Sequence, residues 1–174
     1  HERTGLDVYD SIGTTEILHI FIANRPGALK PATTGRLVAG YEAKIVGEDG
    51  KAVATGERGK LMIRGDSLFK YYWRNPEKTA QSLIGGRLAT GDSYHQDEDG
   101  FFICGGRNDD MMKVGGIWCS PVEIEARLVD HDKVLEAAVV GREDADDLVK
   151  PEAHVVLKDA ADASDDLAAE LLQH

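Results

Sequence analysis

The sequence is poor in cysteine and in long apolar runs, and each shortage argues against a class of protein. Its 174 residues include two cysteines, Cys104 and Cys119, with no C-x-x-C spacing. A disulfide scaffold and a cysteine zinc site are therefore disfavoured, and reduced thiols in a cytoplasmic protein are the simplest interpretation. No uninterrupted apolar run approaches the roughly 18 residues of a membrane span. Residues 1–5 lack both an initiator Met and the apolar segment of a secretory signal peptide.

Basic charge is also in short supply. Acidic residues outnumber basic ones by 31 to 20, which gives a formal net charge of −11. Because nucleic acids and anionic membrane surfaces are polyanions, neither is expected as the main partner. A local anion site stays compatible with this charge, since backbone N–H groups and an arginine can hold a phosphate. The hydrophobic content of 42% and the length are sufficient for a buried core.

The first two thirds of the chain are rich in short strand patterns. Apolar and β-branched residues at 6–10 and 17–23 predict two buried strands around a turn of small residues. A helix is expected over residues 71–82, with Pro76 near its first turn. Further strands and hairpins are predicted at residues 35–38, 41–46, 59–64, 94–96 and 101–104.

The pattern changes after residues 105–110, where two glycines and polar residues predict a hinge or domain boundary. A compact βαββα pattern follows, with strands at 111–114, 117–119, 134–140 and 153–157. Ser120 and Glu123 form a capping box that begins a helix. Val122, Ala126 and Val129 share one face of that helix, which is expected to pack on the core. Ser164 is predicted to cap the last helix.

The turn Gly13-Thr14-Thr15-Glu16 is the first candidate for chemistry. Glycine lets a backbone approach a ligand closely, and threonine hydroxyls can donate to phosphate oxygens. The Glu16 carboxylate could bind a divalent cation that shields those phosphates. His19, three residues further on, would lie near anything the turn binds. A tight turn with a solvated glutamate is the structural alternative.

Two further segments carry polar groups suited to a nucleotide. Asp92, in Thr90-Gly91-Asp92, could accept hydrogen bonds from both hydroxyls of a ribose. Arg107 offers a planar fork of donors, with Asp109 and Asp110 beside it. Ordinary loops with one salt bridge are the alternative, and neither G-x-x-x-x-G-K-[ST] nor G-x-G-x-x-G is present here.

In their order and spacing, these segments resemble motifs of the adenylate-forming superfamily, which includes acyl- and aryl-CoA ligases. Residues 9–16 resemble its fifth core motif, Y-G-x-T-E, with two additional residues after Tyr9. Residues 90–92 resemble the seventh motif, and residues 106–116 with 121–125 resemble the eighth. Within the superfamily, residues 13–21 and 115–118 are most similar to benzoate–CoA ligases.

The resemblance implies a fold of the α/β class combined with an α+β part. Residues 1–108 would be the C-terminal part of the large AMP-binding domain, namely the end of a layered sheet followed by a β-barrel-like subdomain. Residues 109–174 would be an incomplete, mobile α+β lid. The implied reaction joins a benzoate-like aromatic carboxylate to coenzyme A with ATP and Mg²⁺, through an acyl-adenylate, releasing AMP and pyrophosphate.

The resemblance also implies residue roles around the nucleotide. Thr15 would contact the α-phosphate, and Glu16 would hold Mg²⁺; these two would be the catalytic residues. The nucleotide would further contact Gly13 and Thr14 in the same turn, and Asp92 and Arg107 would hold the ribose hydroxyls.

For the acid and the thiol, the resemblance implies another set of positions. Gly13, His19 and Ile20 would touch the acyl pocket, where an apolar wall with one histidine suits an aromatic acid. Asp109 would be the hinge between the two half-reactions. Gly115 and Gly116 would line the path of the coenzyme A pantetheine, where a side chain would block it.

Two motifs of the superfamily are missing: the phosphate loop and the late adenylation lysine. Lys150-Pro151 does not match the lysine motif. The chain is therefore expected to be a C-terminal fragment that forms no adenylate alone. Two alternatives stay open: an adenylate-forming enzyme that uses a carrier-protein thiol, and a non-enzymatic acidic α/β binding module. The module would explain the composition but not the order of the three motifs.

Overall fold

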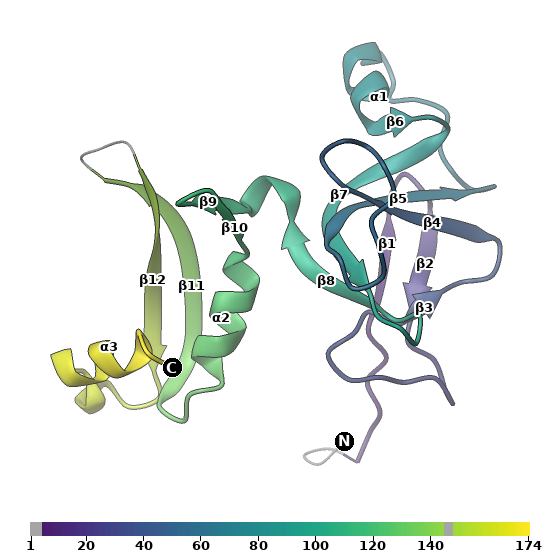
Figure 1. Cartoon of the computed structure of the whole chain (residues 1–174). Helices are drawn as coiled ribbons and strands as arrows, with labels where there is room; N and C mark the ends of the chain where they lie inside the picture. The colour runs from purple at the N-terminus through teal and green to yellow at the C-terminus, as the bar shows by residue number, and fades with distance from the viewer. Residues whose placement is uncertain (1–4, 145–147) are drawn as a thin grey trace. The chain divides into compact units, whose positions relative to one another are not determined.

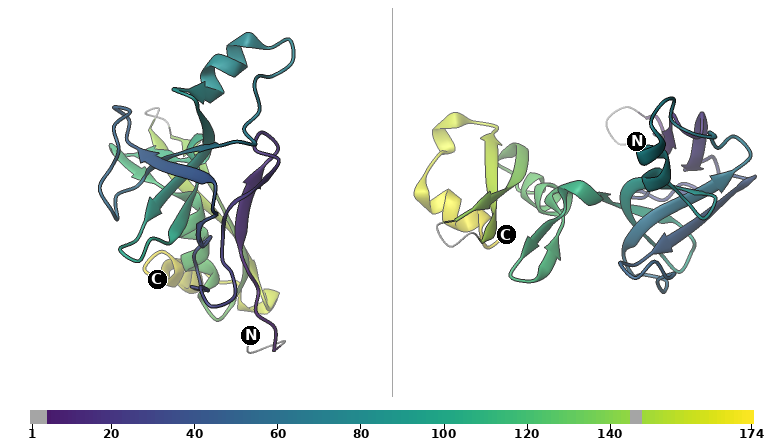
Figure 2. Two further views of the ribbon diagram at one scale, coloured as in Figure 1. Left: turned by 90° about the vertical axis from the view of Figure 1, so that its right-hand side faces the viewer. Right: turned by 90° about the horizontal axis from the view of Figure 1, so that it is seen from above.

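A computed structural model describes residues 5–144 and 148–174 (Figure 1). The chain divides into two compact units, His1–Asn108 and Asp109–His174. Each unit combines antiparallel strands with short helices (Figure 2), so the predicted mixed α/β class is confirmed. None of the helices in the described ranges is long enough and apolar enough to cross a membrane.

The first unit contains two antiparallel sheets. One has the order β1-β2-β3, and the other has the order β4-β5-β7-β6 with β8 pairing β7. The elements are β1 (Ser11–Thr14), β2 (His19–Ala23), β3 (Arg36–Leu37), β4 (Tyr41–Val46), β5 (Gly59–Gly65), α1 (Pro76–Ser82), β6 (Leu83–Ile84), β7 (Arg87–Gln96) and β8 (Phe102–Arg107).

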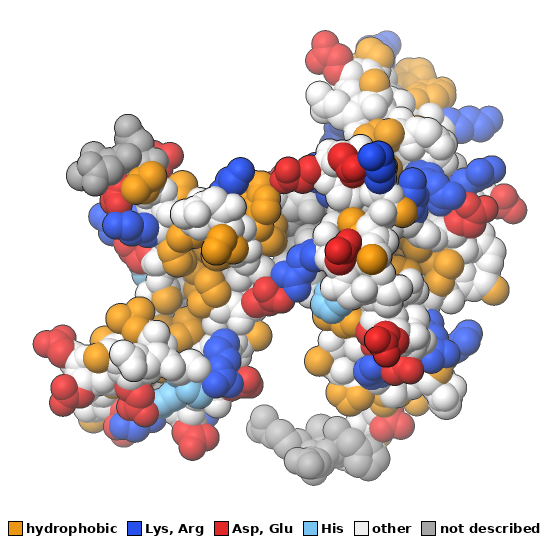
Figure 3. Space-filling view, viewed as in Figure 1, with side chains coloured by type: hydrophobic (Ala, Val, Ile, Leu, Met, Phe, Trp, Pro, Cys, Tyr) orange, Lys and Arg blue, Asp and Glu red, His pale blue; other side chains and the backbone are white. Residues whose placement is uncertain are grey.

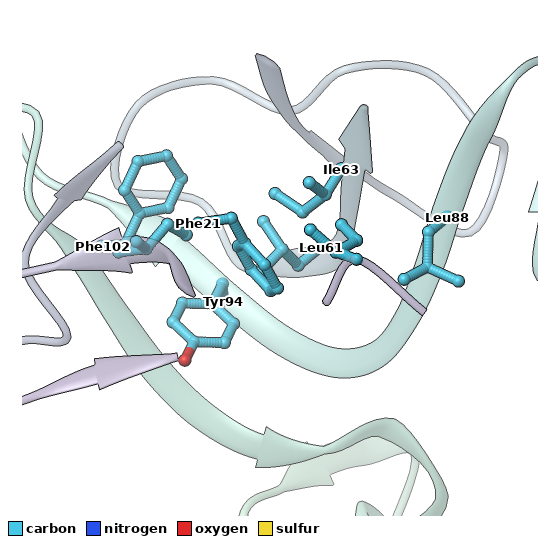
Figure 4. Close-up of a cluster of buried hydrophobic side chains, with 8 residues drawn as sticks. Phe21, Leu61, Ile63, Leu88, Tyr94 and Phe102 are labelled. Atoms are coloured by element: carbon cyan, nitrogen blue, oxygen red, sulfur yellow. The ribbon is translucent and has the colours of Figure 1, made fainter. Parts of the chain in front are cut away.

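A single hydrophobic core joins these two sheets (Figure 4). Phe21 from β2 lies among side chains of β5, β7 and β8, and Tyr94 of β7 is almost fully buried beside it. The Tyr94 hydroxyl is hydrogen-bonded to the Thr34 hydroxyl at 3.2 Å, which satisfies a polar group that would otherwise be costly to bury. The buried members of this core are Ile17, Phe21, Ile22, Leu61, Ile63, Leu88, Tyr94 and Phe102.

The second unit has its own core. Leu128, Met112 and Val139 are buried together there. The side chain of Glu125 accepts a hydrogen bond from the Val139 backbone N–H at 2.8 Å, which ties helix to strand. After η1 (Asn108–Asp110) the elements are β9 (Met112–Val114), β10 (Ile117–Cys119), α2 (Pro121–Val129), β11 (Val134–Glu143), β12 (Val149–Leu157), η2 (Ala160–Asp162) and α3 (Asp165–Leu171).

The prediction of a buried strand at residues 6–10 was wrong. Leu6 and Val8 are 67% and 78% exposed, and the first strand begins at Ser11. β1 pairs with β2 from Ser11 to Thr14, and residues 6–10 lie outside this strand. Asp10 accepts a hydrogen bond from the Asn24 N–H at 2.9 Å, but regular pairing with β2 starts only at Ser11.

Two helix predictions also need correction. The helix predicted over 71–82 begins at Pro76, because Arg74 has a φ of +52° and Asn75 accepts a hydrogen bond from the Lys78 N–H as the N-cap. In α2, Val122 and Val129 are 45% and 43% exposed, so they do not form the core face. Leu128 is buried instead, with Ile124 packed beside it. The predicted caps Ser120 and Ser164 are confirmed.

Candidate active site

The turn between β1 and β2 is held by the chain's own backbone. The N–H groups of Ile17 and Leu18 donate to the carbonyls of Thr14 and Thr15, each at 3.2 Å. A Cβ atom at Gly13 would lie 2.6 Å from the His19 carbonyl oxygen, closer than real Cβ atoms come. Glycine is therefore required by the partner strand itself, whatever ligand the turn binds.

This close approach predicts the effect of Gly13→Ala. The added methyl group would force β1 away from β2, which should lower the free energy of unfolding by about 1–3 kcal/mol. Gly47→Ala is a matched control, because its Cβ would make only ordinary contacts at 3.5 Å. Urea unfolding of both variants measures the difference. Equal stabilities for the two variants would contradict the steric argument.

Glu16 is held at both its backbone and its side chain by one later segment. Its carbonyl oxygen accepts from the Phe69 N–H at 2.8 Å, and its Oε1 accepts from the Tyr72 hydroxyl at 2.6 Å. The Tyr72 hydrogen bond lowers the pKa of Glu16 below its ordinary value, against the opposing effect of burial. Glu16 is therefore an ionised carboxylate at neutral pH.

Asp92 and Arg107 are brought together by strand register. They are directly paired across β7 and β8, and Arg107 Nη1 lies 3.5 Å from Asp92 Oδ1. Asp92 is 9% exposed, and burial raises its pKa although Thr90 and Arg107 act in the opposite direction. Gly91, with a φ of +83°, lets the Arg107 guanidinium approach the backbone, since a Cβ there would meet Nη2 at 3.0 Å.

The raised pKa of Asp92 predicts a stability change with a definite sign. The folded chain binds the Asp92 proton more tightly than the unfolded chain does. The associated stability is therefore fully present below the ordinary pKa of 3.8 and is lost as the pH rises through the folded pKa. Asp92→Asn should thus raise the free energy of unfolding at pH 7 by about 1 kcal/mol. Urea unfolding at pH 7 and in acid checks this: the gain should vanish below the ordinary pKa, and a destabilised variant at pH 7 would contradict it.

Two of the three residues expected at the acyl pocket, His19 and Ile20, lie on the exposed surface of β2. The His19 ring nitrogen Nδ1 lies 2.6 Å from the Ile20 carbonyl oxygen. Because a carbonyl only accepts, Nδ1 carries the proton, and Nε2 of the neutral ring is an acceptor. Ile20 is 42% exposed and pairs directly with Gly13 across the strands.

The remaining three predicted positions are in the second unit. Asp109 is the first residue of that unit and lies in η1. Gly115 and Gly116 form the two-residue turn between β9 and β10, with φ values of +56° and +89°. A Cβ on either glycine would meet nothing within 4 Å. Their immediate structural reason is therefore the left-handed backbone of this turn.

The predicted nucleotide residues form two groups, one around Asp92 and one around Glu16, beside one hydrophobic core. Ile17, next to Glu16, and Tyr94, close to Asp92 on β7, belong to the same hydrophobic core. Within residues 5–144 and 148–174, the hydrogen bonds and ion pairs link Asp92 to Arg107 and Glu16 to Tyr72, without linking one pair to the other.

Sequence reasoning missed Tyr72. The signal that could have found it is the aromatic run at residues 71–73, which ends two residues before the helix cap Asn75. The rings of Tyr72 and Phe69 meet edge to face with centroids 4.6 Å apart. This packing aims a phenol at the turn that contains Glu16.

Glu16 would give a divalent cation a single carboxylate ligand, and the described residues do not supply a complete coordination shell. No group of three or more His, Cys, Asp or Glu within the described residues could hold a metal ion. Mg²⁺ commonly binds through one or two carboxylates, with water and substrate phosphates as its other ligands. The ionised Glu16 fits that pattern. The buried Thr14 hydroxyl beside it also helps to lower the pKa of Glu16.

Comparison with known protein families shows which family the chain belongs to. The family model for "AMP-binding enzyme" matches residues 1–73, and the model for "AMP-binding enzyme C-terminal domain" matches residues 123–174. The chain belongs to the AMP-binding enzyme family. Solved members have the same fold, so the resemblance to adenylate-forming enzymes is confirmed.

Several AMP-binding enzymes are similar over almost the whole chain. A benzoate–CoA ligase of Thauera aromatica is 46% identical over 99% of this chain and 33% of its own length. A 4-hydroxybenzoate–CoA/benzoate–CoA ligase of Rhodopseudomonas palustris is 44% identical over 92% of this chain and 30% of its own. This chain thus spans about a third of the length of these curated relatives.

Solved structures agree with the sequence comparison. The anthranilate CoA ligase AuaEII in complex with anthranoyl-AMP has a TM-score of 0.90 and 47% identity, over 99% of this chain and 34% of that protein. A benzoate CoA ligase from Burkholderia xenovorans LB400 has a TM-score of 0.87 and 47% identity, over 96% of this chain and 33% of that protein.

Proposed function

We propose that the enzyme containing this chain is an aromatic carboxylate–CoA ligase. It would activate a benzoate-like acid with ATP and pass the acyl group from the adenylate to coenzyme A, releasing AMP and pyrophosphate. One observation carries the proposal: a buried carboxylate, Asp92, is paired across adjacent strands with Arg107, in a chain that is 46% identical to a benzoate–CoA ligase.

The first unit would hold the nucleotide. Asp92 would accept hydrogen bonds from the ribose hydroxyls, and Arg107 would donate to the same sugar. Thr15 would contact the α-phosphate, with Gly13 and Thr14 in the same turn. Fixed donors and charges around a phosphate lower the barrier to acyl-phosphate formation mainly by positioning and charge neutralisation.

Glu16 would be the protein ligand of Mg²⁺. When bound with ATP, the ion would neutralise phosphate charge and so favour attack by the acid. Glu16 suits this role because its hydrogen bond from Tyr72 lowers its pKa and keeps it ionised.

The acyl group would lie beside the exposed face of β2. The exposed Ile20 side chain offers an apolar surface for an aromatic ring. His19 would donate to the acid only as the imidazolium, because its Nδ1–H is already used by the Ile20 carbonyl.

The second unit would serve the thioester step as a mobile lid. Asp109 would be the hinge about which this unit moves, and Gly115 and Gly116 would line the path of coenzyme A. The same hairpin exposes Ile117 and Trp118, which are 71% and 51% accessible. Hydrophobic side chains gather over β9, β10 and α2 (Figure 3).

The acceptor assay tests the proposed function. The purified enzyme containing this chain would be given benzoate, ATP and Mg²⁺ with either coenzyme A or a holo-carrier protein, at neutral pH. We propose that the reaction takes place in the cytoplasm. Benzoyl-CoA formation without acyl-carrier formation is expected. Acylation of the carrier alone would favour the carrier-protein alternative, and the absence of pyrophosphate release with any aromatic acid would contradict the proposal.

A further inference from the structure

We propose that Tyr72 is a positioning residue of the metal–nucleotide site, and that it fixes the Glu16 carboxylate in the orientation that receives a divalent cation bound to ATP. The inference rests on the proposed function of Glu16. It assigns a new role to the segment that leads into α1, which none of the three nucleotide motifs includes.

The contact between Tyr72 and Glu16 is short and specific. The phenol donates to Glu16 Oε1 at 2.6 Å, and hydrogen bonds to charged acceptors of this length are among the stronger ones in proteins. A carboxylate has about four acceptor positions, so the other positions stay available for a cation and its water. The phenol thus limits rotation of the carboxylate without occupying it.

Tyr72 is itself held in place by the start of α1. Its backbone N–H donates to Thr79 Oγ1 at 3.0 Å, and that hydroxyl donates to the Asn75 carbonyl at 2.8 Å. The Asn75 N–H in turn donates to the Tyr72 carbonyl at 3.2 Å. These bonds make the aromatic segment and the first turn of α1 one rigid support.

The same segment brings a positive charge to this site. Lys78 Nζ lies 4.6 Å from the centroid of the Tyr72 ring. This cation therefore lies over the same ring whose hydroxyl donates to Glu16. A residue that orients a metal-binding carboxylate typically changes metal affinity by about 10-fold or more when it is lost.

The test separates metal-dependent from metal-independent nucleotide binding. Calorimetry would measure the Kd of the enzyme for ATP with saturating Mg²⁺ and for ATP in EDTA, with no carboxylic acid or coenzyme A present. For Tyr72→Phe we expect the Kd for MgATP to rise about 10-fold and the Kd for metal-free ATP to stay unchanged. Tyr71→Phe, which removes an exposed neighbouring hydroxyl, should change neither value.

A second comparison keeps the proposal falsifiable if Tyr72→Phe is less stable. In a Glu16→Gln background, Tyr72→Phe should have no further effect on MgATP affinity, because the positioned carboxylate is already gone. An unchanged MgATP affinity, equal losses with and without Mg²⁺, or the same loss in the Glu16→Gln background would overturn the role of Tyr72. Since no acid is present, these outcomes are independent of a failed benzoate assay, which would count against the proposed function alone.

Discussion

Asp92→Ala is expected to raise the KM for ATP about 10- to 100-fold in the enzyme that contains this chain. The proposed contacts join a carboxylate to the ribose hydroxyls, and the net loss of one hydrogen bond to a charged group costs about 1.5–3 kcal/mol. Asp92 is buried beside Arg107, which would fix the position of its carboxylate. Initial rates of pyrophosphate release at varied ATP measure the change.

Asp92→Asn is the matched control for this variant. It keeps the size of the side chain and removes the charge, and it is expected to be more stable than the wild type while still losing ATP affinity. The KM for the aromatic acid should change little in both variants, since Asp92 would touch only the sugar. Unchanged ATP kinetics in a folded Asp92→Ala enzyme would contradict the ribose assignment.

Asp109→Pro is expected to slow thioester formation about 100-fold while leaving adenylation nearly unchanged. Asp109 lies where the two compact units meet in the sequence, and proline would fix its φ near −65°. A unit that must turn about this residue would then reach its second position poorly, and small misplacements of reacting groups cost rates of that order. Pyrophosphate exchange reports adenylation, and release of acyl-CoA from preformed adenylate reports the second step.

Asp109→Ala is the matched control, because it removes the same side chain but keeps backbone freedom. It should retain most of the thioester rate. Equal losses in both half-reactions for Asp109→Pro would argue against a hinge, and so would an Asp109→Ala enzyme as slow as the proline variant.

Helix caps and tight turns could be predicted from the sequence, because a few neighbouring residues determine them. Ser120 and Ser164 accept hydrogen bonds from N–H groups three residues later, as capping requires. The turn at Gly115 and Gly116 follows from their tolerance of positive φ. Family resemblance suggested which residues to propose for nucleotide binding, and the register of β7 and β8 pairs two of them, Asp92 and Arg107.

Features that depend on distant partners could not be read from the sequence. Tyr72 and Glu16 are 56 residues apart, and no sequence spacing relates them. The strand expected at residues 6–10 is absent, because apolar side chains alone do not determine where regular pairing with β2 begins. In α2, several apolar residues compete for the core face, and packing against β9 and β11 selects Leu128.

A crystal structure of the intact enzyme with AMP bound tests the central claim most directly. The account predicts the ribose hydroxyls within hydrogen-bond distance of the Asp92 carboxylate and the Arg107 guanidinium, and the phosphate beside Thr15. It also predicts that Tyr72 still donates to Glu16. Nucleotide bound elsewhere, with Asp92 and Thr15 opening onto separate surfaces, would contradict it.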